Sequence, residues 1–506
     1  MKPAVVRDKL REHRFLLILS VSYFVLQYAL NAFHGFGYFT DEMYYLACAA
    51  RPAAGYVDQP PMSIWILRLV VALAGDSLPA IRLLPALAGG ATVFLTGLLA
   101  RRLGGNALAS ILAGLCVIAS PVLMVLFGFY SMNSFEVCLW TAFTLTAVKA
   151  LTEDRPKLWL LAGLIAGLGL ENKHTMGVYA FAFFSGLPIS SERKHFKSPW
   201  VWIGGALAGL LLLPNLVWQM QTGWQSLEFY RNADAIKNLD NPAWKVMLDQ
   251  ILSQNPMSVI LWLPGLFFLL LGHQTQKVRA FGWAYLILLA VVIVAHSSRP
   301  DRIAAAYPIL FASGACFLVR LNRRWPAYAV GSLLILGGAA FAPAGLPVLS
   351  PDKLAAYAQT IGVIPQIEKG DVAPMPMWFG NRFDWDRVYE SVRVVYDSLP
   401  ANEKSTAVVY TGYYTQAGAI ERFGRGSIPV ISGHNNYYLW GKDGSNWNTV
   451  IALGVEEQKL SEVFAEVHQV GSYSRRFTND TDVPIYLCRQ PRLTRAEMWR
   501  KAKVYL

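Results

Sequence analysis

Long apolar segments separated by short polar stretches run through residues 15–345. After the first, at 15–33, they fall near 79–100, 106–127, 133–149, 157–171, 174–190, 199–218, 257–272, 280–296, 302–320 and 326–345. About 20 apolar residues span a bilayer as an α-helix, and a helix satisfies its own backbone groups in lipid. The pattern predicts an α-helical polytopic membrane protein with about eleven transmembrane helices.

The first apolar segment follows a basic N-terminus that contains Lys2, Arg7, Lys9, Arg11 and Arg14. This arrangement resembles a signal peptide, but the apolar run is too long and no small-residue cleavage site follows promptly. We therefore predict a retained first helix.

Beyond residue 345 the pattern changes to alternating helix-like and strand-like segments. Helices are predicted at 354–361, 384–399 and 456–467, and strands at 406–410, 428–431, 449–453 and 483–488, before an amphipathic stretch from Thr494. This alternation is typical of a small α/β domain. Two domains are therefore expected: a transmembrane domain, 1–345, and a C-terminal domain, 346–506.

Composition and charge agree with a membrane protein. The 506 residues are 54% hydrophobic and 15% charged, whereas soluble domains carry about 25% charged residues. The net charge of +12 lies in short clusters between apolar segments rather than on one face or tail, which argues against nucleic acid as a partner. Such clusters indicate membrane topology.

The basic clusters fall at every second junction between apolar segments: 101–102, 149–157, 193–197, 277–279 and 320–324. The positive-inside rule places these junctions and the N-terminus in the cytoplasm. The first outer loop, 34–78, and the C-terminal domain then face the periplasm. The prediction is a multi-pass protein of the bacterial inner membrane.

The first outer loop contains Asp41, Glu42 and Asp58 at the edge of lipid. Acidic residues are costly there unless they are solvated, paired or used. One interpretation is a solvated interfacial loop with aromatic anchors. The other is a general base, or a divalent-metal ligand, that activates an acceptor.

Residues 62–74 are apolar but too short to span a bilayer comfortably. They follow Pro60 and Pro61, which stop a preceding helix. We predict a helix along the outer surface, so that the loop surrounds its acids in a cavity that opens sideways to lipid.

Basic and polar residues mark three more outer turns: Asn133 with Glu136, Lys173 with His174, and Arg299 with Arg302. The cations can snorkel to the interface, or they can form an anion site, because guanidinium groups fit phosphate by geometry. Asn133 and Glu136 can share one helix face, although helix capping also explains such residues.

Several motifs follow one another in chain order: Thr40-Asp41-Glu42-x-Tyr44-Tyr45, Gly55-Tyr56-x-Asp58-x-Pro60-Pro61, Tyr130-Ser131-Met132-Asn133, Asn172-Lys173-His174, Arg299-Pro300-Asp301-Arg302, Gly412-Tyr413-Tyr414 and Ile431-Ser432-Gly433-His434-Asn435. The ordered set resembles the bacterial dolichyl-phosphate-mannose-protein mannosyltransferase-like family (glycosyltransferase family 39). These are integral membrane glycosyltransferases of the GT-C class, similar also to the aminoarabinose transferase that modifies lipid A.

The resemblance implies an enzyme that moves a sugar from a polyprenyl-phosphate carrier to an acceptor outside the cytoplasm, with inversion. The essential acid of the first outer loop maps to Asp41, with Glu42 beside it, and the second acid maps to Asp58. Relatives that modify lipid A have a Glu-Lys pair before the two prolines. This chain has Asp58–Gln59, so the basic partner is missing there.

In such a reaction Asp41 would deprotonate or orient the acceptor. Preorganised cations would stabilise the charge that develops on the lipid phosphate, and the candidates are Arg302, Arg299 and Lys173. Further candidates for the cavity are Tyr45, Gln59, Asn133, Glu136, His174 and His434. A divalent ion, if one takes part, has Asp41, Glu42 and Asp58 as candidate ligands.

A transporter or flippase of lipid-linked sugars is the alternative function. It predicts polar groups near the bilayer midplane and paired repeats, and the sequence shows neither clearly. Within the transferase interpretation, hexosyl and pentosyl transfer both stay open. So do lipid, glycan and protein acceptors.

Overall fold

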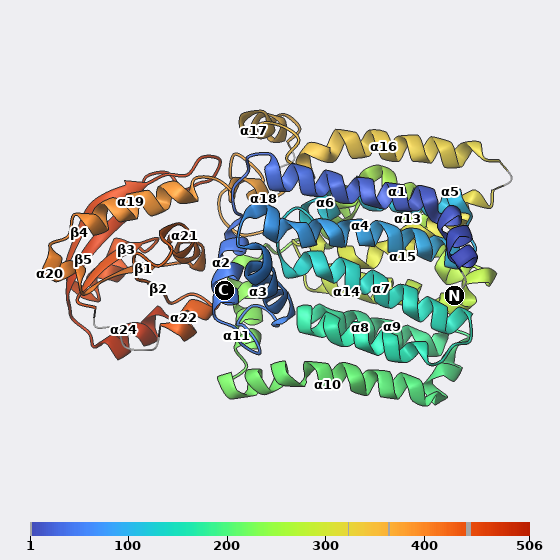
Figure 1. The fold of residues 1–506 in the computed structure, drawn as a ribbon, viewed down its shortest axis with the longest axis horizontal. Helices are drawn as coiled ribbons and strands as arrows, with labels where there is room; N and C mark the ends of the chain where they lie inside the picture. Colours follow the sequence, from blue (N-terminus) through green and yellow to red (C-terminus); the bar gives the residue numbers. More distant parts are fainter. Residues whose placement is uncertain (1–2, 322, 363–364, 442–446) are drawn as a thin grey trace.

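The structure is a computed structural model that describes residues 3–506 except 322, 363–364 and 442–446. Lys2 of the basic N-terminal cluster lies outside the described residues. A bundle of helices that run side by side forms the larger part, and a smaller domain with a β-sheet lies at one end of it (Figure 1).

Every apolar segment predicted to span the membrane coincides with helix. The bundle consists of α1 (Pro3–Phe33), α4 (Leu78–Arg102), α5 (Ala107–Ala119), α6 (Pro121–Leu126), α7 (Met132–Thr152), α8 (Leu158–Asn172), α9 (Thr175–Gly186), α10 (Pro199–Thr222), α13 (Val259–Leu271), α14 (Ala280–Val294), α15 (Tyr307–Val319) and α16 (Trp325–Gly345). The segment 106–127 is split into α5 and α6, because Pro121 cannot continue the first helix.

Six helices of the described part are long and apolar enough to cross a membrane, or seven spans if the bent pair 243–253 and 256–271 counts as one. Shorter apolar helices, among them α5, α8 and α14, pack between them. The chain is therefore a multi-pass membrane protein.

Short helices cover the end of the bundle that faces the sheet domain. They include α2 (Thr40–Ala50), α3 (Met62–Ala74), α11 (Gln225–Asn232) and α12 (Ala243–Ser253). In Figure 1, α2, α3 and α11 lie between the bundle and the sheet domain. The linker from α16 to that domain contains α17 (Pro351–Thr360) and α18 (Met377–Gly380).

The C-terminal sheet has the strand order β2-β1-β3-β5-β4. Its strands are β1 (Ala407–Thr411), β2 (Val430–Ser432), β3 (Thr449–Leu453), β4 (Phe464–Tyr473) and β5 (Val483–Pro491). Strand β1 is parallel to β2 and β3, whereas β5 is antiparallel to β3 and β4.

Helices cover both faces of this sheet. On one face, α19 (Trp385–Asp397) and α21 (Tyr414–Gly424) share a hydrophobic core with β1 and β3. On the other face, α24 (Arg495–Ala502) contributes Met498. The remaining helices are α20 (Ala401–Lys404), α22 (Asn436–Trp440) and α23 (Glu457–Ser461). The predicted fold class, a polytopic helical domain followed by an α/β domain, is confirmed.

The helix predicted at 456–467 is wrong in its second half. Helix α23 ends at Ser461, and strand β4 begins at Phe464. Residues of β4 pair with β5, for example Val467 with Cys488. The pairing across the sheet supplies hydrogen bonds that the local pattern does not reveal, and it overrides the helical tendency.

The sheet domain docks on the loop that follows α1, through α21 and α2. Met43 of α2 lies in the same hydrophobic core as Ala419 of α21. Gly418 permits the close approach, because a Cβ there would lie 3.2 Å from the backbone nitrogen of Tyr44. This docking brings the start of α21 to the start of α2.

Candidate active site

Asp41 lies in the first turn of α2, where the helix dipole favours a carboxylate. The hydroxyl of Tyr414, at the start of α21, donates a hydrogen bond of 2.8 Å to its Oδ1. Burial raises the pKa of Asp41 above its usual range, although the Tyr414 hydrogen bond opposes this shift. The C-terminal domain thus contributes a hydrogen-bond donor to Asp41, the principal predicted catalytic residue.

Asp58 has a matching tyrosine partner. The hydroxyl of Tyr44 donates to Asp58 Oδ1 at 2.8 Å, and the rings of Tyr44 and Tyr414 lie 4.7 Å apart between centroids. Burial raises the pKa of Asp58 to about 6, and the charge of Asp41 adds to the increase. The fold therefore brings the two carboxylates together, each held by one of two neighbouring tyrosines.

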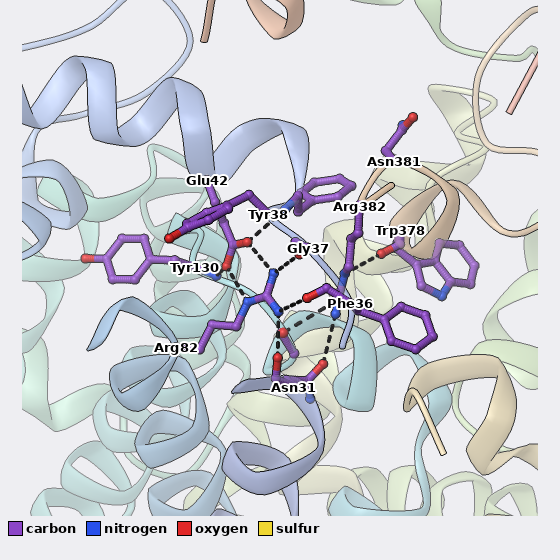
Figure 2. Close-up of polar contacts among 12 residues, drawn as sticks. Asn31, Phe36, Gly37, Tyr38, Glu42, Arg82, Tyr130, Trp378, Asn381 and Arg382 are labelled. Carbon is purple, nitrogen blue, oxygen red and sulfur yellow. Dashed lines mark hydrogen bonds and ion pairs between the residues drawn. The ribbon is translucent and has the colours of Figure 1, made fainter. Parts of the chain in front are cut away.

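Glu42 is fully buried and binds Arg82 (Figure 2). Arg82 donates to its Oε1 from Nε at 2.9 Å and to its Oε2 from Nη2 at 2.5 Å. The backbone N–H groups of Phe39 and Tyr130 each donate at 2.9 Å. Burial alone would raise the pKa of Glu42, but Arg82 and these donors lower it. Glu42 is a structural anchor in this geometry.

The Glu42 anchor joins four parts of the chain. Arg82 of α4 also donates to the backbone oxygens of Asn31 at 2.6 Å and Gly37 at 2.7 Å. Arg382, from the linker that leads to the sheet domain, donates to the Asn31 side chain at 3.1 Å. Figure 2 shows both guanidinium groups converging on Asn31. The network holds the start of α2 against α1, α4 and the linker.

The predicted metal ligands are not arranged as a set. Both oxygens of Glu42 are occupied by Arg82 and backbone donors, which leaves Asp41 and Asp58, whose charges interact. Among the described residues, no group of three or more His, Cys, Asp or Glu side chains is placed to hold a metal ion. A site made of all three predicted ligands does not fit this geometry.

Arg299 and Arg302 lie on one turn near these carboxylates. Arg299 pairs with Asp301 at 3.2 Å and with Glu368 at 3.6 Å. The guanidinium of Arg302 makes no hydrogen bond or ion pair with any described residue, although the charges of Arg299 and Asp301 act on it. A half-buried cation without a partner is suited to bind an anion.

Lys173 is already paired. Its Nζ donates to Asn133 Oδ1 at 2.8 Å and to Glu136 Oε2 at 2.7 Å. The structure thus joins three predicted site residues from α7 and the α8–α9 turn. Since Glu136 balances its charge, Lys173 is less available for an anion than Arg302.

His174 contacts Tyr230 and Asn215. Its Nδ1 lies 2.9 Å from the Tyr230 hydroxyl, and its Nε2 lies 3.1 Å from Asn215 Oδ1. The charges of Asp58 and Glu136 both act on Tyr230. His174 therefore lies on the side of the site between the carboxylate pair and the Lys173 cluster.

The other three predicted residues have different surroundings. Tyr45 is buried edge-to-face against Tyr130, with 6.4 Å between ring centroids. Gln59 is fully buried, and neither polar atom of its amide has a partner among the described residues. His434 accepts the backbone N–H of Tyr414 at Nδ1, 3.1 Å away.

His434 is neutral. Because Nδ1 accepts a hydrogen bond, the ring proton is on Nε2, which lies 2.8 Å from the main-chain oxygen of Leu506. Burial lowers the pKa of His434 to about 3. The side chain therefore positions the backbone of Tyr414.

Tyr414, Lys237 and Glu368 were not predicted as site residues. Tyr414 was visible as part of the Gly412-Tyr413-Tyr414 motif, whereas no local pattern distinguishes Lys237 or Glu368 from surface charges. Lys237 ends the π-helical turn Ala233–Lys237, and its charge acts on both Asp41 and Asp58. Only tertiary contacts place it there.

Comparison with known protein sequences shows similarity to membrane sugar transferases. Residues 58–218 match the family described as dolichyl-phosphate-mannose-protein mannosyltransferase. The chain is 25% identical over 182 residues to an undecaprenyl phosphate-alpha-4-amino-4-deoxy-L-arabinose arabinosyl transferase of Pseudomonas fluorescens Pf-5. It is 30% identical over 128 residues to the corresponding transferase of Pseudomonas savastanoi pv. phaseolicola. The first match covers 35% of this chain and 32% of the relative, and the second covers 23% of each.

Solved structures show the same fold over most of the chain. ArnT from Cupriavidus metallidurans in the apo state aligns with a TM-score of 0.61 at 13% identity, over 93% of this chain and 97% of that one. The archaeal oligosaccharyltransferase AglB from Archaeoglobus fulgidus aligns with a TM-score of 0.51 at 12% identity, over 87% of this chain and 69% of that one. The resemblance predicted from the sequence motifs is confirmed.

Proposed function

We propose that this chain is an inner-membrane glycosyltransferase that moves a sugar from a polyprenyl-phosphate carrier to an acceptor on the periplasmic side. The observation that supports this proposal most is the pair of carboxylates Asp41 and Asp58, both with raised pKa values. The charge of Arg299 acts on Asp41, and the unpaired Arg302 lies on the same turn as Arg299. This site lies at the end of a membrane bundle, where a lipid-linked substrate can enter. The similarity to the arabinosyl transferases of Pseudomonas supports the proposal.

The proposed reaction is a single displacement. The acceptor hydroxyl or amine gives its proton to Asp41 and attacks the anomeric carbon. The bond between that carbon and the oxygen of the lipid phosphate breaks, and its electron pair stays on the phosphate. Attack opposite to the leaving group inverts the configuration.

The side chains have separate roles in this reaction. Asp41 is the general base, since a raised pKa brings a carboxyl closer to the working pH. Tyr414 and Tyr44 orient the two carboxylates. Arg302 and Arg299 stabilise the charge that develops on the phosphate, and Lys173 supports them from the neighbouring turn.

The test uses membranes that contain wild-type protein or Asp41→Asn, and a panel of radiolabelled polyprenyl-phosphate sugars. We expect transfer from one donor by the wild type, and a loss of about 10²–10⁴-fold in the variant, as for removal of a general base. Equal transfer by both proteins contradicts the role of Asp41. Donor flipping without transfer by the wild type supports the transporter alternative.

A further inference from the structure

The Glu368 carboxylate pairs with two cations close to Asp41, the proposed base. Glu368, in the linker segment 365–370 between α17 and α18, lies 3.3 Å from Lys237 Nζ and 3.6 Å from Arg299 Nη1. The side chains of Lys237, Glu368 and Arg299 are 28%, 23% and 30% exposed. The contact is thus sheltered but open to exchange with an incoming group.

This ion cluster belongs to the site. The charges of Lys237, Glu368 and Arg299 all act on Asp41, and Arg302 is the neighbour of Arg299 on the same turn. Among the described residues, Glu368 is the one carboxylate paired with Lys237. If Glu368 left, Lys237 would join Arg302 as a cation without an ion-pair partner among the described residues.

Polar contacts hold the backbone of the segment 365–370 on this site. The Lys369 N–H donates to the Lys237 backbone oxygen at 2.8 Å, Lys369 Nζ donates to the Ala235 oxygen at 2.8 Å, and Ser298 Oγ donates to the Ile367 oxygen at 2.6 Å. An antiparallel bridge also joins Glu368 to Asn238. The backbone at Glu368 is thus fixed beside Lys237, and exchange with an incoming anion needs only the Glu368 side chain to change rotamer.

We propose that Lys237 and Arg299 form the subsite for the phosphate of the lipid-linked donor, and that the Glu368 carboxylate stands in for this phosphate until the donor binds. The inference rests on the proposed function, and it adds that Glu368 controls the binding of the donor. Exchange replaces one anion with another, so Lys237 always has an anionic partner, while Arg299 also keeps Asp301. It also gives the carboxylate a role in expelling the lipid phosphate product.

Binding of undecaprenyl phosphate to the purified full chain tests this inference. Glu368→Gln removes the competing charge and should lower the Kd by up to about fivefold, the range of a partly exposed ion pair. Lys237→Gln should raise the Kd about tenfold. The double variant should bind no more tightly than Lys237→Gln, which would show that the two effects are coupled.

A matched control removes the same charge from the same linker. Asp371, three residues further on, is exposed and makes no side-chain ion pair with the described residues. Asp371→Asn should leave the Kd unchanged. Inorganic phosphate is the second probe, and equal competition by it at the same concentration would assign the subsite to free phosphate and overturn the proposal.

The outcomes separate the two proposals. If the wild type binds the lipid phosphate and Glu368→Gln binds equally or more weakly, the stand-in role is wrong and the transferase proposal is untouched. If neither protein binds it, both proposals fail. If binding follows the expected order but Asp41→Asn still transfers sugar at the wild-type rate, only the proposed mechanism fails.

Discussion

At the scale of single residues, three acids of one outer loop have different roles because their partners differ. Asp41 and Asp58 each accept one tyrosine hydroxyl, and burial raises both pKa values. Glu42, adjacent to Asp41 in sequence, is neutralised by Arg82. Burial without a cation raises the pKa of a carboxyl, as at Asp41 and Asp58, whereas a buried cation beside it lowers the pKa, as at Glu42.

Tyr44→Phe should move the acid limb of the pH profile. The Tyr44 hydroxyl stabilises ionised Asp58, so its removal raises the pKa of Asp58 above about 6. The acid limb of kcat/KM for transfer should then shift to higher pH. Tyr389→Phe is the control, because it removes a hydroxyl from α19 whose one hydrogen-bond partner among the described residues is Ser427. An unchanged limb would show that Asp58 does not titrate in the reaction.

Arg302→Ala should weaken donor binding much more than acceptor binding. A hydrogen bond to a charged group contributes about 1.5–3 kcal/mol, which corresponds to a Kd increase of roughly 10–100-fold. The measurement is the Kd of undecaprenyl phosphate together with the KM of the acceptor. Arg302→Lys should restore part of the affinity, since it keeps the charge but loses the forked geometry. Unchanged donor affinity in Arg302→Ala would refute the clamp.

At the scale of elements, the site depends on the docking of α2. The buried Glu42–Arg82 pair holds this helix to α4, and the contact around Gly418 holds it to α21. Both contacts are needed to keep Asp41 beside Tyr414. The elements that carry the chemistry are therefore short, and longer helices on both sides fix their positions.

Arg82→Met should destabilise the protein strongly. It leaves the Glu42 carboxylate buried without its cation, and breaking a buried pair costs about 3–5 kcal/mol. The exposed pair Arg393–Glu390 gives the comparison, because Arg393→Met should cost less than about 1 kcal/mol. The measurement is the unfolding temperature in detergent for both variants. Equal temperatures would contradict the anchoring role of Glu42.

At the scale of the whole molecule, the membrane domain supplies the acids and arginines, and the C-terminal domain closes over them. Tyr414 and His434 come from this domain, and Glu368 comes from the linker that leads to it. In Figure 1, α2 and α21 meet at the junction of the two parts. The domain is thus part of the proposed active site.

The proposed orientation predicts that alkaline phosphatase fused after residue 506 is active, because this enzyme needs the oxidising periplasm to form its disulfides. A fusion after Arg102, in a predicted cytoplasmic turn, should be inactive. Enzyme activity is compared with the amount of fusion protein in the membrane. An abundant but inactive fusion at 506 would reverse the topology.

The sequence alone determined the membrane class, the positions of the apolar helices and most of the strands, because burial in lipid or in a sheet imposes a local period on the chain. Motif order also made Asp41, Asp58 and Arg302 candidates for the site. Only the tertiary structure showed that Glu42 is an anchor, that Lys173 is paired, and that 464–473 is a strand. It alone brought Tyr414, Lys237 and Glu368 to Asp41. Partners far apart in sequence leave no periodic signal, since their contacts depend on how the helices and the sheet domain pack.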